Sequence, residues 1–249
     1  MKKQLILSAI AAVALGAPAA SMAESLDFNY KVDRFADIEV LRYKVPDFEQ
    51  LTIQQKELVY YLTEAALYGR DILTDQNGKY NLAIRTTLEN IYKNYDGSKD
   101  DADYKGFVLY LKQVWFANGI HHHYSTDKFT PQFSQTFFET QVKKLSKKQL
   151  PLKKGQTVDA FLKEITPVIF DPTVMAKRVN QANGQDLILT SANNYYEGVT
   201  QAEVEQFYAA MKKTDNPEEP ISYGLNSRLV KRDGKPVSYT HLTLPTNSR

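Results

Sequence analysis

Hydrophobic residues recur every three or four positions along most of this chain, which is the spacing of one face of an α-helix. Two of these stripes follow residue pairs with capping-box spacing, Thr52 with Gln55 and Thr200 with Glu203. The pattern predicts an amphipathic helix after Thr52 and another over about 201–213. Their stripes are Leu58, Tyr61, Leu62, Ala65, Ala66 and Gly69 in the first, and Val204, Phe207, Tyr208 and Met211 in the second.

Two more helices follow the first one. The turn sequence DQNG at residues 75–78 precedes the second helix. The third runs from about Asp101 to Asn118, with Gly119 where a left-handed C-cap is expected. The expected buried stripes are Ile84, Leu88, Ile91, Tyr92 and Tyr95 in one, and Tyr104, Phe107, Val108, Leu111, Val114 and Trp115 in the other.

The rest of the pattern adds two helices and two strands. Helices are predicted over 134–145 and 157–165, the second stopping near Pro167. The apolar run DLILT, residues 186–190, indicates a buried strand, although so short a run is also compatible with a helix. Residues 227–231 indicate a strand that enters a tight Asp-Gly hairpin turn. The predicted fold class is mainly α with a minor β part (α+β).

The first residues have the pattern of a secretory signal peptide. Lys2 and Lys3 precede an apolar run from Leu5 to Leu15, and the small-residue site at residues 21–23 marks cleavage before Glu24. A membrane anchor is the alternative, but the run is much shorter than the roughly 20 residues that span a bilayer. We therefore expect residues 1–23 to be removed and the product to be periplasmic or secreted, with no membrane association after signal removal.

The last residues are unusual in a different way. Residues 237–246, VSYTHLTLPT, resemble the translation of an adapter used in sequencing libraries. The alternative is a natural hairpin strand, which the alternation of Val237, Tyr239 and Leu242 would suit. We expect residues 237–249 to be an artefactual tail, so that residues 24–236 are the genuine, truncated segment of one domain's size.

Composition excludes several functions. The chain has no cysteine, which rules out a lipid-modified N-terminus, disulfides and cysteine-bound zinc. Its 31 basic and 29 acidic residues nearly balance, so no nucleic-acid partner is expected. A local basic run alternates with leucines and is interpreted as a solvated helix end and loop. It comprises Lys143, Lys144, Lys147, Lys148, Lys153 and Lys154.

Three consecutive histidines, His121 to His123, are the most conspicuous candidate chemistry. A hydrolytic zinc site on a helix needs a His-Glu-x-x-His pattern or a near variant, and no histidine here is followed by glutamate. At most His121 and His123 share a face, so a histidine-based metal sensor remains only a minor hypothesis. No nucleophile elbow or phosphate loop occurs, so no catalytic residue is assigned in this chain.

The same stretch offers recognition chemistry, because flat amphipathic rings gather next to a helix end. Trp115 and Phe129 are expected to be core residues. His123 and Tyr124 lie past the C-cap glycine and are better placed to face a cleft, so they are the candidate ligand-binding residues.

Several long segments resemble dipeptidyl peptidase III in its bacterial, signal-bearing form. The likeness covers approximately residues 35–236. It includes LTIQQKELVYYLTEAALYGRDILTDQNGKYN, KQVWFANGIHHHYSTDKFTP, DPTVMAKRVNQANGQDLILTSANNYY and ISYGLNSRLVKRDGK. The resemblance implies a two-lobed zinc exopeptidase that releases N-terminal dipeptides from short peptides, with a cleft between a β-barrel lobe and a helical lobe.

The resemblance also limits what this chain can do. The family's zinc motifs, His-Glu-x-x-x-His and a downstream Glu-Glu-x-x-Ala-Asp type, do not occur here, so no zinc is predicted to bind this chain and it is expected to be inactive alone. His123, Tyr124 and Ser125 occupy the positions of a Ser-Phe-Gly loop near the substrate in animal members, with different residues. The alternative is a non-enzymatic periplasmic helical module that binds peptides or glycans.

Overall fold

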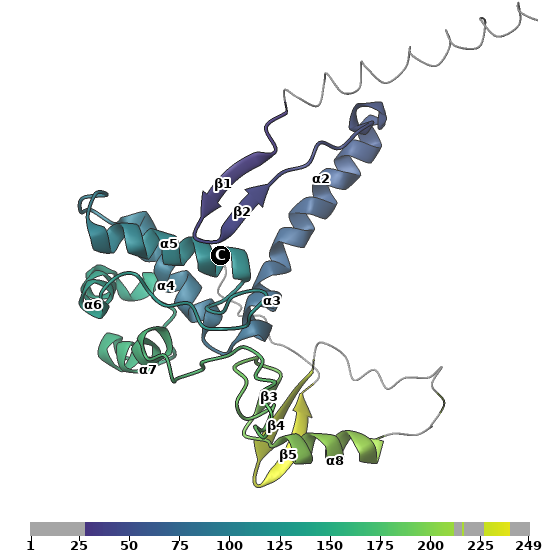
Figure 1. Ribbon diagram of the computed structural model, residues 1–249, viewed down its shortest axis with the longest axis vertical. Coiled ribbons are helices and arrows are strands. Elements are labelled where there is room, and N and C mark those ends of the chain that lie inside the picture. Colours follow the sequence, from purple (N-terminus) through teal and green to yellow (C-terminus); the bar gives the residue numbers. More distant parts are fainter. Residues whose placement is uncertain (1–27, 212–215, 217–226, 240–249) are drawn as a thin grey trace, which may run out of the picture. The chain divides into compact units, whose positions relative to one another are not determined.

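The computed structural model describes residues 28–211, Asn216 and 227–239. The chain divides into two compact units, Met1–Leu58 and Val59–Arg249 (Figure 1). The predicted signal peptide lies outside the described residues, as do residues 240–249 of the suspected tail. The described part is mainly helical with two small sheets, which confirms the predicted α+β class. No helix within it is long and apolar enough to span a membrane.

The first unit contains an antiparallel hairpin that the sequence pattern did not predict. Strand β1 (Lys31–Phe35) pairs with β2 (Ile38–Leu41), and a 3-10 turn, η1 (Phe48–Gln50), follows. The hairpin turn places Ala36 in the left-handed region, with a φ of 49°.

Helix α2 (Ile53–Tyr68) begins at the predicted capping box. The Thr52 amide donates to Gln55 Oε1 at 2.9 Å, and the Gln55 amide donates to Thr52 Oγ1 at 3.3 Å, so both halves of the box are present. The helix is confirmed, yet none of its side chains is buried. Its apolar stripe, including Tyr61 at 67% exposure, therefore faces outward in the described chain.

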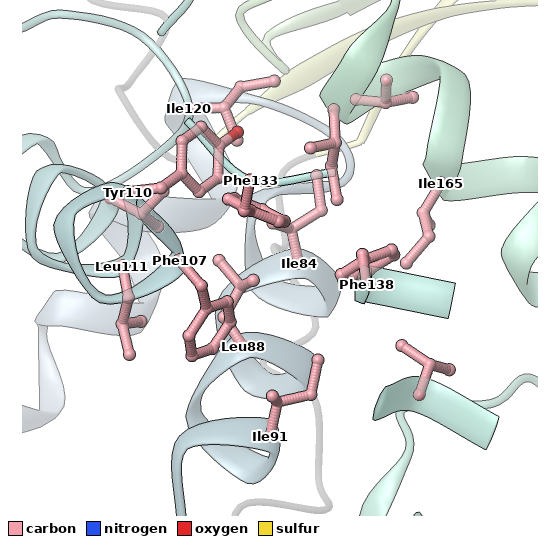
Figure 2. Close-up of a cluster of buried hydrophobic side chains, with 14 of the residues drawn as sticks. Ile84, Leu88, Ile91, Phe107, Tyr110, Leu111, Ile120, Phe133, Phe138 and Ile165 are labelled. Carbon is pink, nitrogen blue, oxygen red and sulfur yellow. The ribbon is translucent and has the colours of Figure 1, made fainter. Parts of the chain in front are cut away.

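Five helices form the body of the second unit, and all but the first of them contribute side chains to one apolar core (Figure 2). They are α3 (Arg70–Asn77), α4 (Asn81–Asn94), α5 (Ala102–Ala117), α6 (Gln135–Lys144) and α7 (Val158–Phe170). A 3-10 turn, η2 (Lys147–Gln149), lies between the last two. Helix α4 packs on α5, and α6 on α7. The largest side chains at the centre are Ile84, Leu88, Ile91, Phe107, Tyr110, Leu111, Phe138 and Ile165.

Three details of these helices differ from the prediction. The segment predicted as a turn, residues 75–78, instead completes α3, and only Gly78 lies beyond its end. The left-handed C-cap of α5 is Asn118, with a φ of 51°, and not Gly119. Helix α7 continues through Pro167 to Phe170. A proline inside a helix costs roughly 3 kcal/mol, but burial of Val168 and Ile169 offsets about that much.

The C-terminal part of the second unit is a small sheet with one helix. Strand β3 (Tyr196–Glu197) pairs in parallel with β4 (Arg228–Arg232), which pairs in antiparallel with β5 (Lys235–Tyr239) through the predicted Asp-Gly turn. Helix α8 (Gln201–Met211) begins at its predicted capping box, and residues 212 and 213 lie outside the described part. Val199, Val204 and Leu229 form a second core here.

Two strand predictions in this region have different outcomes. Residues 186–190 are a turn and not a buried strand, because the Asp186 carboxylate accepts the amides of Ile188 and Leu189 at 2.9 Å each. The hairpin at Asp233-Gly234 is confirmed, and residues 237–239 of the suspected tail lie in its returning strand. The foreign origin of residues 237–249 stays a prediction.

Candidate functional site

The three histidines lie in a tight loop that follows α5 and not in the helix itself. The loop is closed by two backbone bonds, from the His122 amide to the Asp127 carbonyl at 2.8 Å and from the Phe129 amide to the Ile120 carbonyl at 2.9 Å. An isolated bridge between His121 and Lys128 continues the pairing. The loop is thus a short hairpin whose tip, residues 122–126, lies at the surface.

His121 is a core residue. Its side chain is buried, and Nε2 lies 2.7 Å from the Met175 carbonyl oxygen, so this nitrogen carries the proton and donates it to that oxygen. Burial lowers the pKa of the ring to about 4, so His121 is neutral at physiological pH. The ring fixes the loop to residue 175 and does not face solvent.

His122 shapes the tip of the loop. Its Nδ1 accepts the backbone amides of Tyr124 and Ser125 at 3.2 and 3.1 Å, which fixes the turn between them. Its carbonyl accepts the Thr126 amide at 3.1 Å. These hydrogen bonds lie within the loop itself, and they fix the backbone of its tip, residues 122–126.

The geometry does not suit a metal site on the three histidines, which was the minor hypothesis. His121 Nε2 is committed to a carbonyl and His122 Nδ1 to two backbone amides, so those atoms are not available as ligands. Across residues 28–211 and 227–239 no three histidine, aspartate or glutamate side chains are grouped to hold a metal ion. No chemical step is assigned to a metal on these residues.

A second segment, residues 171–180, is connected to the loop by hydrogen bonds. The Arg178 amide donates to the Thr126 carbonyl at 2.8 Å, and its guanidinium donates to the His123 carbonyl at 3.1 Å and to Asn77 Oδ1 at 3.2 Å. In the same way, Thr126 Oγ1 donates to the Val179 carbonyl at 2.9 Å. Arg178 therefore connects the tip of the loop to the end of α3.

Lys128 supports the base of the loop. Its ammonium donates to the carbonyls of Val168 at 3.0 Å, Val174 at 2.7 Å and Asp171. Burial lowers the pKa of Lys128, while the nearby Asp171 carboxylate acts in the opposite direction. The three bonds thus go to backbone carbonyls in the last turn of α7 and just beyond its C-terminal end, where a cation is favoured by the helix dipole.

The candidate binding residues lie at the outer surface of this fixed loop. Tyr124 is 85% exposed, and His123 lies between it and Phe116, with ring centroids 4.3 and 5.0 Å apart. Phe116 is also exposed. The structure therefore brings His123 and Tyr124 together on one aromatic surface, which we call the loop surface.

Phe129 and Trp115 were both predicted to be core residues, and the structure confirms only one of the two predictions. Phe129 is buried, as expected. Trp115 is 38% exposed, which makes its core assignment wrong: the indole Nε1 donates to Glu89 Oε1 at 2.9 Å, and the ring meets Tyr92 edge-on with centroids 6.1 Å apart. The amphipathic indole thus keeps its polar edge on the surface of α4.

A cavity of about 310 Å³ opens beside the base of the loop. Its lining is mostly apolar, with the Asp127 and Lys177 ion pair, 2.7 Å apart, among its polar residues. Sequence reasoning does not reveal this cavity, because its walls come from residues about 40 positions apart. They include Phe129, Pro131, Ile169, Phe170, Pro172 and Ala176.

The arrangement presents aromatic rings on which a ligand could stack. Tyr124 and Phe116 are its exposed rings, while Lys128 is paired with backbone carbonyls and Asp127 with Lys177. No protein-family model matches the chain, and no curated protein matches it either.

Proposed function

We propose that this chain forms part of the peptide-binding cleft of an exported zinc exopeptidase similar to dipeptidyl peptidase III. The catalytic zinc would be held by motifs that do not occur in this sequence. Two kinds of support stand behind the proposal: the resemblance over residues 35–236, and the exposed Tyr124 ring beside the half-buried His123 ring on a loop whose backbone is fixed.

The observation that carries the proposal is the fixed presentation of Tyr124. Its ring is exposed while the backbone at residues 122–126 is held by His122, Arg178 and Thr126. A ring on a backbone that is already fixed loses less conformational entropy when a ligand packs on it than one on a mobile loop, so binding costs less. The apolar cavity next to Phe129 has room for a side chain of an extended peptide.

The first test is a substitution at the exposed ring. We expect Tyr124→Ala to weaken binding of a C-terminally labelled tetrapeptide with a free N-terminus by about five- to tenfold, because one stacking ring is lost. Fluorescence anisotropy with the full chain measures this. Tyr43→Ala is the matched control, since Tyr43 is 76% exposed but lies in the first unit. Equal affinity of the Tyr124→Ala and Tyr43→Ala chains would contradict the proposed site.

The second test concerns hydrolysis. We expect the purified full chain to release no dipeptide from a chromogenic dipeptidyl substrate, with or without added zinc, because the zinc motifs of the family that it resembles do not occur in this sequence. The measurement is absorbance of the released chromophore, with an active zinc exopeptidase as positive control. Zinc-dependent release that a chelator abolishes would show the prediction to be wrong.

A non-enzymatic binding module for glycans is the second candidate, and the exposed Trp115 favours it. Its indole is 38% exposed and is oriented by Glu89 and Tyr92, and sugars stack on the faces of such rings. Trp115 is the only tryptophan of the chain, so its fluorescence reports binding directly. Quenching by oligosaccharides but not by peptides would favour the module over the peptidase cleft.

A further inference from the structure

The chain contains three Asn-Gly pairs, which differ in the hydrogen bonds that hold them in place. They are Asn77-Gly78, Asn118-Gly119 and Asn183-Gly184. Asn-Gly is the pair at which the following backbone nitrogen can most easily reach the asparagine side-chain carbon, because glycine has no Cβ to obstruct it. Whether it does so in a folded chain depends on how firmly the two residues are held.

Two of the pairs are held in place. The Asn77 side chain donates to the Asn118 carbonyl at 3.1 Å and accepts from Arg178 at 3.2 Å, and the Gly78 amide donates to the Asp75 carbonyl at 3.2 Å. At the second pair, the Gly119 amide donates to the Val114 carbonyl at 3.1 Å. In both, the nitrogen that would attack is already engaged.

The third pair has none of these restraints. Asn183 and Gly184 are both exposed at the centre of a turn that the Gln185 amide closes on the Ala182 carbonyl at 3.2 Å. In such a turn the central amide is left without a partner, and within the described chain neither the Gly184 amide nor the Asn183 side chain makes a hydrogen bond. No atom lies within 4 Å of where a Cβ on Gly184 would be.

We propose that Asn183 is a site of spontaneous deamidation in the folded protein. The Gly184 backbone nitrogen attacks Asn183 Cγ, the new C–N bond closes a five-membered succinimide, and the side-chain amino group leaves as ammonia with the proton from the attacking nitrogen. Water then opens the ring at either carbonyl. The products are aspartate and isoaspartate, and the second carries one additional methylene in the backbone.

The modification places a new negative charge in the loop that contains Asp186. That carboxylate accepts the Gln201 amide at 3.0 Å at the start of α8, as well as two amides of its own turn. Deamidation at residue 183 therefore changes the covalent backbone of the segment leading to this capping aspartate. The inference is independent of the proposed peptidase function, because it rests only on the Asn-Gly pairs.

The test is incubation of the folded full chain at mildly alkaline pH, followed by tryptic mass spectrometry. Asn183 lies in the peptide of residues 179–212, which also contains Asn193 and Asn194 as internal comparisons. We expect deamidation at Asn183 to be at least about tenfold faster than at Asn77 or Asn118, because each hydrogen bond that must break raises the barrier. Two products with the same mass, aspartate and isoaspartate, should separate by chromatography.

Two controls make the result decisive. In guanidinium, where the restraints at Asn77 and Asn118 are removed, the three rates should become similar, and Asn183→Gln should remove the fast product in the folded chain. A folded chain in which Asn183 reacts no faster than Asn77 or Asn118 would overturn the proposal, as would a fast product that persists in Asn183→Gln.

Discussion

Replacing Gly106 by alanine is expected to destabilise the second unit by more than about 3 kcal/mol, although the same change in an ordinary helix stabilises it by about 1 kcal/mol. Gly106 is buried in α5, and a Cβ atom at this position would overlap the backbone carbonyl of Gln132. The close approach of the Gln132 backbone to α5 therefore makes this substitution destabilising, although a glycine-to-alanine change normally stabilises a helix.

The crossing segment cannot easily retreat from the added methyl group. The Ser134 amide and hydroxyl each donate to the Asp103 carboxylate at 2.7 Å, one turn before Gly106 on the same helix. Phe133 is buried and meets the rings of Phe107 and Tyr110 edge-on, with centroids 5.7 and 5.6 Å apart. Moving Gln132 would withdraw Phe133 from the core, which itself costs several kcal/mol.

Urea unfolding monitored by the fluorescence of Trp115 measures the change, because this tryptophan lies on the same helix. Lys105→Ala is the matched control: it alters an exposed neighbour on α5 and is expected to stay within about 0.5 kcal/mol. A Gly106→Ala chain that is as stable as Lys105→Ala would show that the Gln132 backbone is free to move.

The helices could be predicted because their signals are local. The capping pairs at Thr52 and Thr200 and the apolar stripes of α4 and α5 lie within one or two turns of the residues that they organise. The strand prediction for residues 186–190 was wrong for the opposite reason. Its apolar run fits a strand, but Asp186 uses its carboxylate on nearby amides and on Gln201, 15 residues away.

The candidate site was predictable only in part. The exposed position of Tyr124 follows from its place beyond the end of α5, and this much the sequence indicates. The burial of His121 and the position of His123 depend on Met175 and Arg178, which are 54 and 55 residues away. Only the turn-forming role of His122 arises from local contacts, with amides two and three residues away. Nothing in the sequence pattern distinguishes three identical neighbours in advance.

Lys128 is the residue on which the loop depends most, and it is the second place where a large effect is expected. Lys128→Met keeps much of the length of the side chain and removes the ammonium, which leaves the carbonyls of Val168, Asp171 and Val174 without this donor. We expect a loss of about 3 kcal/mol, because hydrogen bonds to a charged group contribute about 1.5–3 kcal/mol and unpaired buried carbonyls add a cost.

The expected damage is concentrated at the loop. Hydrogen exchange of amides in residues 121–130 should accelerate in Lys128→Met by more than in the core of α5, because the base of the loop loses its attachment to α7. Lys177→Met is the matched control, since Lys177 forms an exposed ion pair with Asp127, and such pairs contribute less than about 1 kcal/mol. Equal stability and equal exchange in the two variants would show that the backbone carbonyls of residues 168–174 find other partners. In that case the fixed presentation of Tyr124 must come from His122, Thr126 and Arg178 without a contribution from Lys128.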